Sequence, residues 1–543
     1  MKHAAIKLFG CILLAAQAGL TYGQQLGATG YKTEIYYDLE DENAALVSFD
    51  WDTNGNLYYS TGSPFWDLGF GVYRFDGTTS QCLYYDTNCF AGSRVTAIGD
   101  MIYFNDGGNY NVFDFNYFRY NPASAEAPTN LFVSTNLWGL DTRNENDFWA
   151  SGGANGSIYY SELDADGDLI NTPPINLGTI GNASGPLAFN AAGDLYYAEG
   201  YNTAGSTVYR WSAAEVAAAI ADPNRAPLRP SGHSFAVLQT GDGSTGLQID
   251  PEGHVLITAT SFAAPSELQR LLMLNGAYVG YEVVARSNSR FETLRMLNDK
   301  IYLNTGRAIF TIEADKTLRL IAQAGQDGPV TLIGLNDEDQ NLRLANIFGG
   351  APGWVVRDIN EDRLLAQAGH GGAVAIAELD DAGMPTNIIV VADSAPGWTA
   401  RSLDGNCILA QAGDGGMVGI QELDRSYQPS KFTVVCGAIP GWIARSLDGN
   451  RILAQAGDGG AVIVAKLNER HQITGYKVIA DTVPGWIARK MNENLLLAQA
   501  GHGGMTIVME LDDQYNMVGP RLVFNAAPGL ALVGLEIIIY GAD

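Results

Sequence analysis

The chain has 543 residues, a formal net charge of −27, only 17% charged residues, 64 glycines and 10% aromatic residues. Few charges with many glycines and aromatic residues argue against disorder and are typical of a turn-rich all-β protein, here long enough for two to four domains. The acidic balance argues against nucleic acid and anionic membranes as partners.

Residues 1–23 have the pattern of a secretory signal peptide. Lys2 and Lys7 supply the positive start, Leu8–Leu20 the apolar core, and Thr21–Gly23 small residues before the expected cleavage point. No later run reaches the apolar length of a membrane span. We therefore expect a secreted protein, periplasmic or extracellular, without a membrane span.

A loose pattern fills residues 24–320. A strand, a polar turn and an aromatic strand recur six times, with copies near Val47, Asp100, Asp141, Phe189, Ile249 and Asn298. Such units read as hairpins, and six of them predict a degenerate six-bladed β-propeller. The phrase Asp-x-x-Gly-x-Leu-Tyr resembles the blades of NHL and gluconolactonase-type propellers. That resemblance implies a central channel that can hold a divalent metal, although no ligand set can be transferred residue by residue.

One interruption of this region is predicted to be helical. Ser212 and Glu215 have the spacing of a capping box, and an alanine-rich run follows to Ala221 before Asp222-Pro223. We expect a short surface helix inserted between strands of one blade.

A strict repeat of 44 residues occupies residues 321–543. Its tryptophans are Trp354, Trp398, Trp442 and Trp486; its arginines are Arg357, Arg401, Arg445 and Arg489; its glutamines are Gln323, Gln367, Gln411, Gln455 and Gln499. Each unit divides into four short runs rich in Ile, Val and Leu, separated by Gly, Asn and Asp, which is the pattern of a propeller blade.

The number of blades in this second propeller is predicted to be five or six. The segment Leu530–Leu535 looks like a first strand without a blade of its own, so it could pair with the first unit and close a five-bladed ring. The run Ile537–Tyr540 aligns with a second strand, which leaves a sixth, incomplete blade as the alternative.

Two families resemble these repeats. The phrase Pro-Gly-Trp followed by Leu447-Asp448-Gly449-Asn450 resembles the FG-GAP/VCBS-type repeats of secreted bacterial propellers. Those repeats carry an Asp-rich calcium loop, which is reduced here to Asp-Gly-Asn. The unit length and number also resemble the tachylectin-type sugar-binding propellers.

The repeated Trp, Arg and Gln have two possible roles. They could form one small pocket per blade, in which the Trp stacks on a sugar ring and the Arg and Gln bind its hydroxyls. Alternatively, the Arg and Gln satisfy buried carbonyls between blades and the Trp packs there, which we consider the stronger interpretation.

Two further sets of polar residues are candidate metal ligands. Asp50, Asp52 and Asn54 have the spacing of the first half of a calcium loop, but no acid follows at the twelfth position, so a hairpin turn is favoured. Calcium is the one possible cofactor. The residue after each Gln-Ala-Gly is Gln326, His370, Asp414, Asp458 or His502. One such residue per blade is too widely spread to bind a metal.

The four cysteines of the mature chain are expected to behave differently. Cys82 and Cys89 flank six residues, a spacing that predicts a disulfide across a small loop in an oxidising compartment. Cys407 and Cys436 fall on the second and fourth strands of one blade, too far apart for a bond, and should be free and buried.

The sequence carries no common catalytic fingerprint. We therefore expect a secreted, non-enzymatic protein that binds an extracellular glycan or another surface ligand, including a protein, through its propeller faces. The alternatives are a metal-dependent, lactonase-like hydrolase in the first propeller and a structural component of an extracellular assembly. The oligomeric state stays open.

Overall fold

The computed structural model describes most of the chain from residue 31 to residue 539. The segments outside the described residues are 1–30, 40–43, 63–68, 88–93, 107–113, 125, 136, 154, 203–204, 239–242, 252, 261–265, 275–276, 299, 315, 325–327, 336–341, 349–352, 381–384, 526–529 and 540–543. The expected signal peptide lies outside the described residues. In the part of the chain that the structure describes, no helix is long and apolar enough to cross a membrane.

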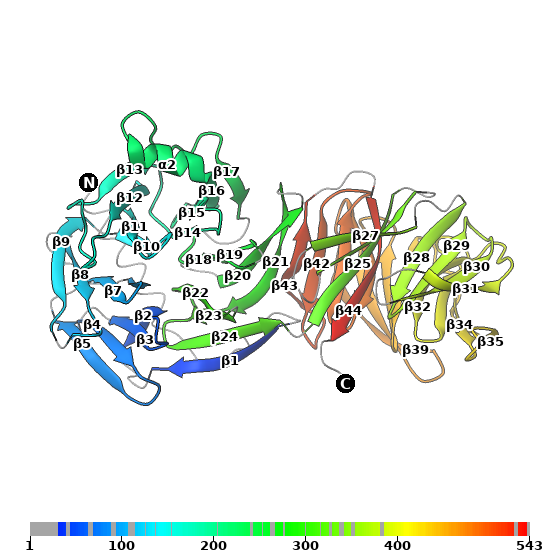
Figure 1. Cartoon of the computed structure of the whole chain (residues 1–543). Coiled ribbons are helices and arrows are strands. Elements are labelled where there is room, and N and C mark those ends of the chain that lie inside the picture. Colours follow the sequence, from blue (N-terminus) through cyan, green and yellow to red (C-terminus); the bar gives the residue numbers. More distant parts are fainter. Residues whose placement is uncertain are drawn as a thin grey trace. The chain divides into compact units, whose positions relative to one another are not determined.

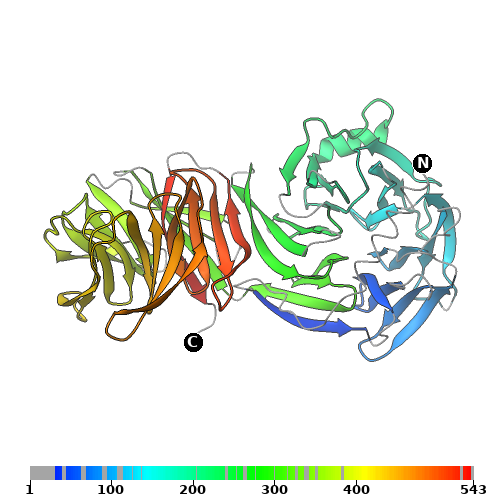
Figure 2. The ribbon, with the colours of Figure 1, turned by 180° about the vertical axis from the view of Figure 1, so that it is seen from behind.

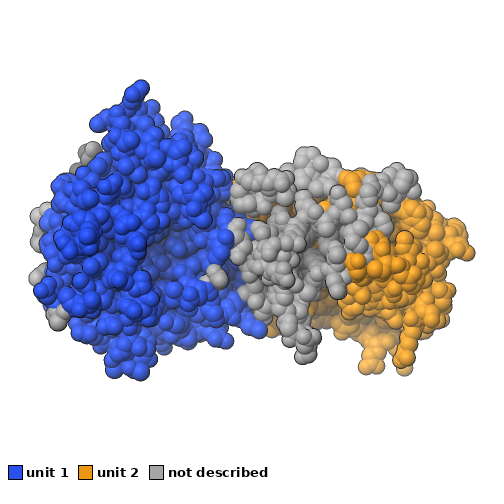
Figure 3. All heavy atoms as spheres, viewed as in Figure 1, with its two compact units in different colours: residues 1–271, 283–313 blue, residues 272–282, 314–543 orange. Residues whose placement is uncertain are grey.

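The chain forms two compact units, coloured separately in Figure 3: residues 1–271 with 283–313, and residues 272–282 with 314–543. Each unit is a β-propeller built from four-stranded antiparallel blades (Figure 1). The prediction of two tandem β-propellers is therefore confirmed.

The first propeller has six blades within its described residues, matching the six loose repeats. Blade 1 consists of β2 (Ala45–Trp51), β3 (Leu57–Gly62), β4 (Phe70–Phe75) and β5 (Ser80–Asp86); blade 2 of β6 (Val95–Ile98), β7 (Met101–Asn105), β8 (Asp114–Tyr120) and β9 (Thr129–Thr135). Blade 3 consists of β10 (Leu137–Asp141), β11 (Asp147–Gly152), β12 (Ser157–Glu162) and β13 (Ile175–Thr179); blade 4 of β14 (Leu187–Phe189), β15 (Leu195–Ala198), β16 (Thr207–Trp211) and β17 (Ser234–Val237). Blade 5 consists of β18 (Leu247–Ile249), β19 (Val255–Ala259), β20 (Ser266–Leu274) and β21 (Ala277–Ser287); blade 6 of β22 (Leu294–Leu297), β23 (Lys300–Asn304), β24 (Ala308–Ala314) and β1 (Tyr31–Asp38).

The first propeller closes through its N-terminal strand. Strand β1 pairs with β24 and is the outermost strand of blade 6, so the beginning and the end of this unit lie side by side, as both ribbon views show (Figures 1 and 2). Such closure removes free strand edges from the ring.

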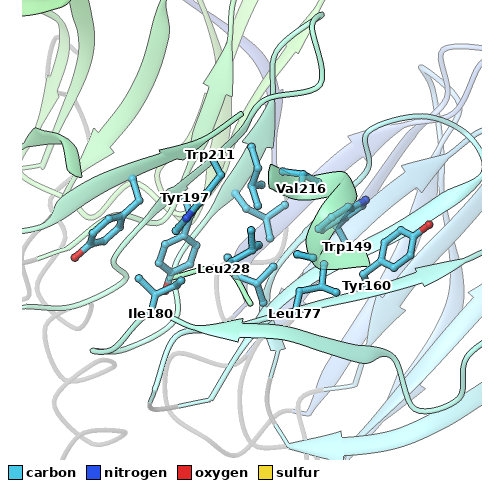
Figure 4. Close-up of a cluster of buried hydrophobic side chains, with 13 residues drawn as sticks. Trp149, Tyr160, Leu177, Ile180, Tyr197, Trp211, Val216 and Leu228 are labelled. Atoms are coloured by element: carbon cyan, nitrogen blue, oxygen red, sulfur yellow. The ribbon is translucent and has the colours of Figure 1, made fainter. Parts of the chain in front are cut away.

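The predicted helix is confirmed as α2 (Ala213–Ala221), inserted between β16 and β17. The Ser212 hydroxyl caps it and the Glu215 carboxylate accepts a hydrogen bond from the Ser212 backbone N–H, as a capping box requires. Val216 turns inward and joins a buried cluster with Trp149 and Trp211 (Figure 4). The helix therefore covers part of the core instead of being a loose decoration.

The second propeller has five blades among its described residues. Blade 7 consists of β44 (Leu530–Ile539), β25 (Lys316–Ala324), β26 (Val330–Leu335) and β27 (Leu342–Phe348); blade 8 of β28 (Trp354–Asn360), β29 (Arg363–Ala368), β30 (Val374–Leu379) and β31 (Pro385–Ala392). Blade 9 consists of β32 (Thr399–Asp404), β33 (Cys407–Gln411), β34 (Val418–Leu423) and β35 (Pro429–Cys436). Blade 10 consists of β36 (Trp442–Asp448), β37 (Arg451–Ala456), β38 (Val462–Leu467) and β39 (Ile473–Ala480); blade 11 of β40 (Trp486–Asn492), β41 (Leu495–Ala500), β42 (Thr506–Leu511) and β43 (Met517–Phe524).

The last strand decides between five and six blades. Strand β44 is the innermost strand of blade 7 and pairs with β25 from Leu530↔Ala324 to Ile539↔Lys316 (Figure 1). The run that aligned with a second strand continues this one long strand. The ring therefore closes with five blades, and the six-blade alternative is wrong.

Candidate functional site

The innermost strand of every blade in the second propeller carries a β-bulge at the same place. The register shifts between Val356 and Asp358 in blade 8, and equivalently between Ala400/Ser402, Ala444/Ser446 and Ala488/Lys490. In blade 7 the shift leaves Val533 as the extra residue of β44. A bulge redirects the side chain of its extra residue and bends the strand. In blades 8 to 11 that residue is the repeated arginine.

The four bulge arginines lie in a ring, which we call the arginine ring: Arg357, Arg401, Arg445 and Arg489. The innermost strands contact one another around the channel, from β28 through β32, β36 and β40 to β44 and back to β28. The charges of neighbouring guanidinium groups also repel one another. Burial and the neighbouring charge of Arg401 lower the pKa of Arg357 to about 10, and burial and Arg445 lower that of Arg489 to about 10. Arg357 and Arg489 therefore stay charged at neutral pH.

The ring opens on the face formed by the turns between the second and third strands. Arg357 Nη2 donates to the carbonyl of Gly369 (3.3 Å), and Arg445 and Arg489 donate to Gly457 and Gly501 (each 3.4 Å). These glycines are the last residues of the repeated Gln-Ala-Gly, where the turns begin. The guanidinium groups consequently lie at this face of the propeller.

Only two of the four arginines have a carboxylate partner among the described residues. Arg401 Nη2 lies 2.6 Å from Asp414 Oδ1, and Arg445 Nη2 lies 2.7 Å from Asp458 Oδ1. In blades 8 and 11 the same turn position holds His370 and His502, both exposed. Arg489 Nη2 lies 3.4 Å from Nδ1 of His502.

The Nε atoms of all four arginines are buried and have no hydrogen-bond partner among the described residues. Burying a charged donor without an acceptor is costly. Among the described residues, four guanidinium groups with two carboxylate partners leave a local positive charge in a chain whose formal net charge is −27. The arginine ring is therefore the candidate site of the second propeller.

The residues that follow the ring arginines in the sequence form a buried polar layer. Lys490 Nζ lies 2.5 Å from Asp358 Oδ2, and it also donates to Ser402 Oγ at 3.2 Å. Asp358, Ser402 and Lys490 are at most 3% exposed. Asp358 Oδ2 accepts a further bond from the Leu403 backbone N–H (2.9 Å). We call this buried layer the channel floor.

The repeated glutamines hold neighbouring blades together. Gln411 Nε2 donates to the carbonyl of Trp442 (2.9 Å) and Gln411 Oε1 accepts from the N–H of Ala444 (3.1 Å), both on the next blade. Gln323, Gln367 and Gln455 make the same pair of bonds one blade further along each time. All five glutamines are at most 2% exposed. Each therefore satisfies backbone groups of an adjacent innermost strand.

The repeated tryptophans lie apart from the glutamine amides. The glutamines contact the Trp backbone, while the four indole rings are half-buried. None of the four belongs to the described clusters of buried residues between these blades. The ring of Trp398 contacts Phe432 edge-on, with centroids 5.2 Å apart. The structure thus separates the indole rings from the Arg and Gln side chains. The Arg and Gln side chains contact each other in two blades, where Arg445 Nη2 donates to Gln455 Oε1 (3.2 Å) and Arg489 Nη2 donates to Gln499 Oε1 (3.4 Å).

The predicted calcium ligands of the first propeller point in different directions. Asp52 Oδ1 accepts the backbone N–H groups of Asn54 (3.0 Å) and Asn56 (2.9 Å) and so caps its hairpin. Asp50 instead pairs with Arg295 on blade 6 (3.2 Å). Among the described residues, no group of three or more His, Cys, Asp or Glu side chains could hold a metal ion. Calcium binding stays a prediction.

A second polar cluster lies where the innermost strands of the first propeller meet. Asp141 on β10 has its pKa raised to about 7 by burial and by the charges of Asp50 and Asp147, against the opposing influence of Arg295. Its Oδ1 accepts the N–H of Thr142 (2.8 Å). Such a carboxyl group can take up a proton near neutral pH. The neighbouring acids already have their own partners, because Asp50 pairs with Arg295 and Asp147 pairs with Arg143.

The structure describes three of the four cysteines for which predictions were made. Cys82, Cys407 and Cys436 are free thiols, the first exposed and the other two half-buried instead of fully buried. Cys89 lies outside the described residues. The Cys82–Cys89 disulfide is not seen and stays a prediction.

Sequence reasoning found the ring arginines but assigned each to its own blade. The strict repeat alone does not show a bulge, so the inward turn of the arginine could not be seen. The channel floor was missed altogether because its position does not repeat: it reads Asp358, Ser402, Ser446, Lys490 and Gly534. That break in an otherwise strict repeat was the one available signal.

Comparison with known proteins gives no family. No family model matches the chain, and neither does any curated protein. The narrower family resemblances therefore stay predictions.

Solved structures resemble the chain at low identity. They include the PQQ-bound aldose sugar dehydrogenase of Streptomyces coelicolor (13% identity, 53% of this chain, 99% of that chain, TM-score 0.39). Another is a virginiamycin B lyase of Staphylococcus aureus (11%, 64% of this chain, 96% of that chain, TM-score 0.34). A third is the extracellular domain of a putative one-component system of B. thetaiotaomicron (9%, 95% of this chain, 84% of that chain, TM-score 0.28). These values support no inference about activity.

Proposed function

We propose that the protein is an extracellular binding protein whose second propeller holds an acidic ligand, first of all an acidic glycan, in the arginine ring. The observation that carries this proposal is the convergence of four half-buried arginines, of which only Arg401 and Arg445 have a carboxylate partner among the described residues. Guanidinium groups bind carboxylates and sulfates through charge-assisted hydrogen bonds. Because Arg357 and Arg489, with pKa values of about 10, keep their protons at neutral pH, we assign them to binding and not to proton transfer.

The buried residues next to the ring support a binding role as well. Asp358, Ser402 and Lys490 each directly follow a ring arginine in the sequence, and the bonds among them fix these side chains beside the ring. The repeated glutamines hydrogen-bond the innermost strand of the next blade, and these bonds hold the innermost strands in register and the ring arginines in place. A rigid scaffold with positioned polar groups is what specific binding requires.

The proposal is tested by calorimetric titration of the full chain with trigalacturonic acid and with its uncharged methyl ester. Each ring arginine is replaced singly by Gln, and Arg425→Gln serves as the control. Arg425 lies exposed in the turn between β34 and β35, at the opposite end of the strands from the ring.

We expect the acid to bind, the ester to bind at least tenfold more weakly, and one or more ring variants to lose at least tenfold in affinity. Loss of a charge-assisted hydrogen bond costs about 1.5–3 kcal/mol, which corresponds to that factor. Arg425→Gln should bind like the parent. Equal affinity for acid and ester, or ring variants that all behave like the control, would reject the proposal.

A further inference from the structure

The arginine ring is not symmetric, and its asymmetry indicates where a ligand binds. Around the channel, blade 7 lies between blades 11 and 8. Blade 7 contributes Val533 at the ring position, and its two neighbours contribute Arg489 and Arg357. These two arginines are the ones whose turns carry histidine instead of aspartate.

The chain itself shows what the ring arginines accept. On blades 9 and 10 the carboxylates of Asp414 and Asp458 lie 2.6 and 2.7 Å from the terminal nitrogens of Arg401 and Arg445. Both aspartates are largely exposed, with side chains 73% and 62% accessible, so they reach in from the turn. Strict repetition of the backbone makes blades 8 and 11 offer the same place without its carboxylate.

Resting on the proposed function, we infer that the ligand carries carboxylate groups and binds on the blade 7 side of the ring, with its carboxylates on Arg357 and Arg489. Each carboxylate takes the place that Asp414 or Asp458 takes on the opposite side. Val533 lies between these two places and is half-buried. An apolar side chain at this position suits the C–H face of a sugar ring. The class of ligand is therefore a uronic-acid oligosaccharide, in which carboxylates alternate with apolar ring faces.

The surrounding charges agree with this placement. Asp458 is hydrogen-bonded to Arg445 and offsets part of the effect of burial on its pKa. Burial and a neighbouring arginine lower the pKa of Arg357 and that of Arg489 to about 10, and at Arg489 only the charge of Asp458, without a hydrogen bond, opposes this. A carboxylate bound at Arg357 and Arg489 would relieve this repulsion. The opposite side of the ring already has its own acids and gains less.

The test exchanges turn residues between blades. His370→Asp and His502→Asp install the carboxylate that blades 9 and 10 carry, and Asp414→His removes it from blade 9. Gln428→Glu is the control, because it adds the same negative charge in the exposed turn between β34 and β35. The full chain is titrated with trigalacturonic acid and with a sulfated trisaccharide of neutral sugars.

We expect His370→Asp and His502→Asp each to weaken binding of trigalacturonic acid at least tenfold. Asp414→His should strengthen it severalfold by freeing Arg401, and Gln428→Glu should leave it unchanged. Arg357→Gln and Arg489→Gln should lose more affinity than Arg401→Gln and Arg445→Gln.

Two results would overturn the inference and leave the proposed function standing. One is unchanged affinity in both histidine variants while ring arginine variants still bind more weakly. The other is tighter binding of the sulfated trisaccharide than of trigalacturonic acid. Failure of every acidic sugar to bind would reject both. Far-ultraviolet circular dichroism of each variant confirms that a lost affinity is not a lost fold.

Discussion

Lys490 and Asp358 form a buried ion pair across the channel of the second propeller, with Nζ 2.5 Å from Oδ2. The two residues belong to blades 11 and 8, and their side chains are 4% and 1% exposed. Burial raises the pKa of Asp358, and the Lys490 ammonium works against that rise. The Lys490 ammonium thus stabilises the charged form of the buried Asp358 carboxyl group.

Removing one partner of this pair should destabilise the protein strongly. Lys490→Met leaves the Asp358 carboxylate buried without its cation, and breaking such a pair costs about 3–5 kcal/mol. The double variant Asp358→Leu/Lys490→Met should recover most of that loss. Chemical denaturation followed by circular dichroism measures both. Lys431→Met removes an exposed pair with Glu422 and should cost about 1 kcal/mol or less. A Lys490→Met variant no less stable than Lys431→Met would show that the floor is not a coupled pair.

The hydrogen bonds of the repeated glutamines should contribute as much to the free energy of unfolding as core residues do. Gln411→Leu leaves the carbonyl of Trp442 and the N–H of Ala444 buried without their partner. Each orphaned group costs about 1–3 kcal/mol, so we expect a loss of about 2–4 kcal/mol in denaturant unfolding. Gln428→Leu, in an exposed turn, is the matched control and should stay within about 0.5 kcal/mol of the parent. Similar denaturation midpoints for the two variants would contradict a stabilising role for the hydrogen bonds of Gln411 between blades.

Much of the fold could be predicted from the sequence because it depends on local patterns. The 44-residue step gave the blades of the second propeller, and the capping box at Ser212 gave the helix. The number of blades stayed open because strand β44 has 10 residues and extends beyond the expected Leu530–Leu535, and pattern alone cannot tell one long strand from two short ones. Only pairing with β25 settles it.

The candidate site was harder to predict from the sequence than the fold, for a physical reason. A bulge is a property of two strands paired together, so the sequence of one strand did not reveal that Arg357 and Arg401 turn toward the channel. The ion pair of Asp358 and Lys490 joins residues 132 positions apart and occurs once, outside the repeat. Repetition finds what is common to the blades, whereas this site depends on what differs between them.

Trp398 should contribute less to stability than a residue of the blade core. Its indole is half-buried and touches Phe432 edge-on. We expect Trp398→Ala to cost about 1–2 kcal/mol, between a surface change and a core truncation. Leu409→Ala, at a position that is 0% exposed, should cost about 2–5 kcal/mol. Denaturant midpoints compare them. If Trp398→Ala were the costlier change, the ring would have to be a packing element between blades.

The stability of the first propeller should fall as pH rises because of Asp141. In the unfolded chain this carboxyl ionises near pH 4, whereas burial raises its folded pKa to about 7. Between these values the folded state binds more protons, so its stability is full below about pH 4 and declines until about pH 7. Asp141→Asn should therefore be more stable relative to the parent at pH 8 than at pH 4. Thermal melts at the two pH values check this, and an equal difference at both would refute the assignment.

The most direct test of the arginine ring is a crystal structure of the full chain with trigalacturonic acid. The account requires density for a carboxylate within hydrogen-bond distance of Arg357 and Arg489, above the floor formed by Lys490 and Asp358, with a sugar face toward Val533. Density for the bound sugar against Trp398 or its equivalents, with the ring arginines untouched, would contradict it and place recognition in one pocket per blade.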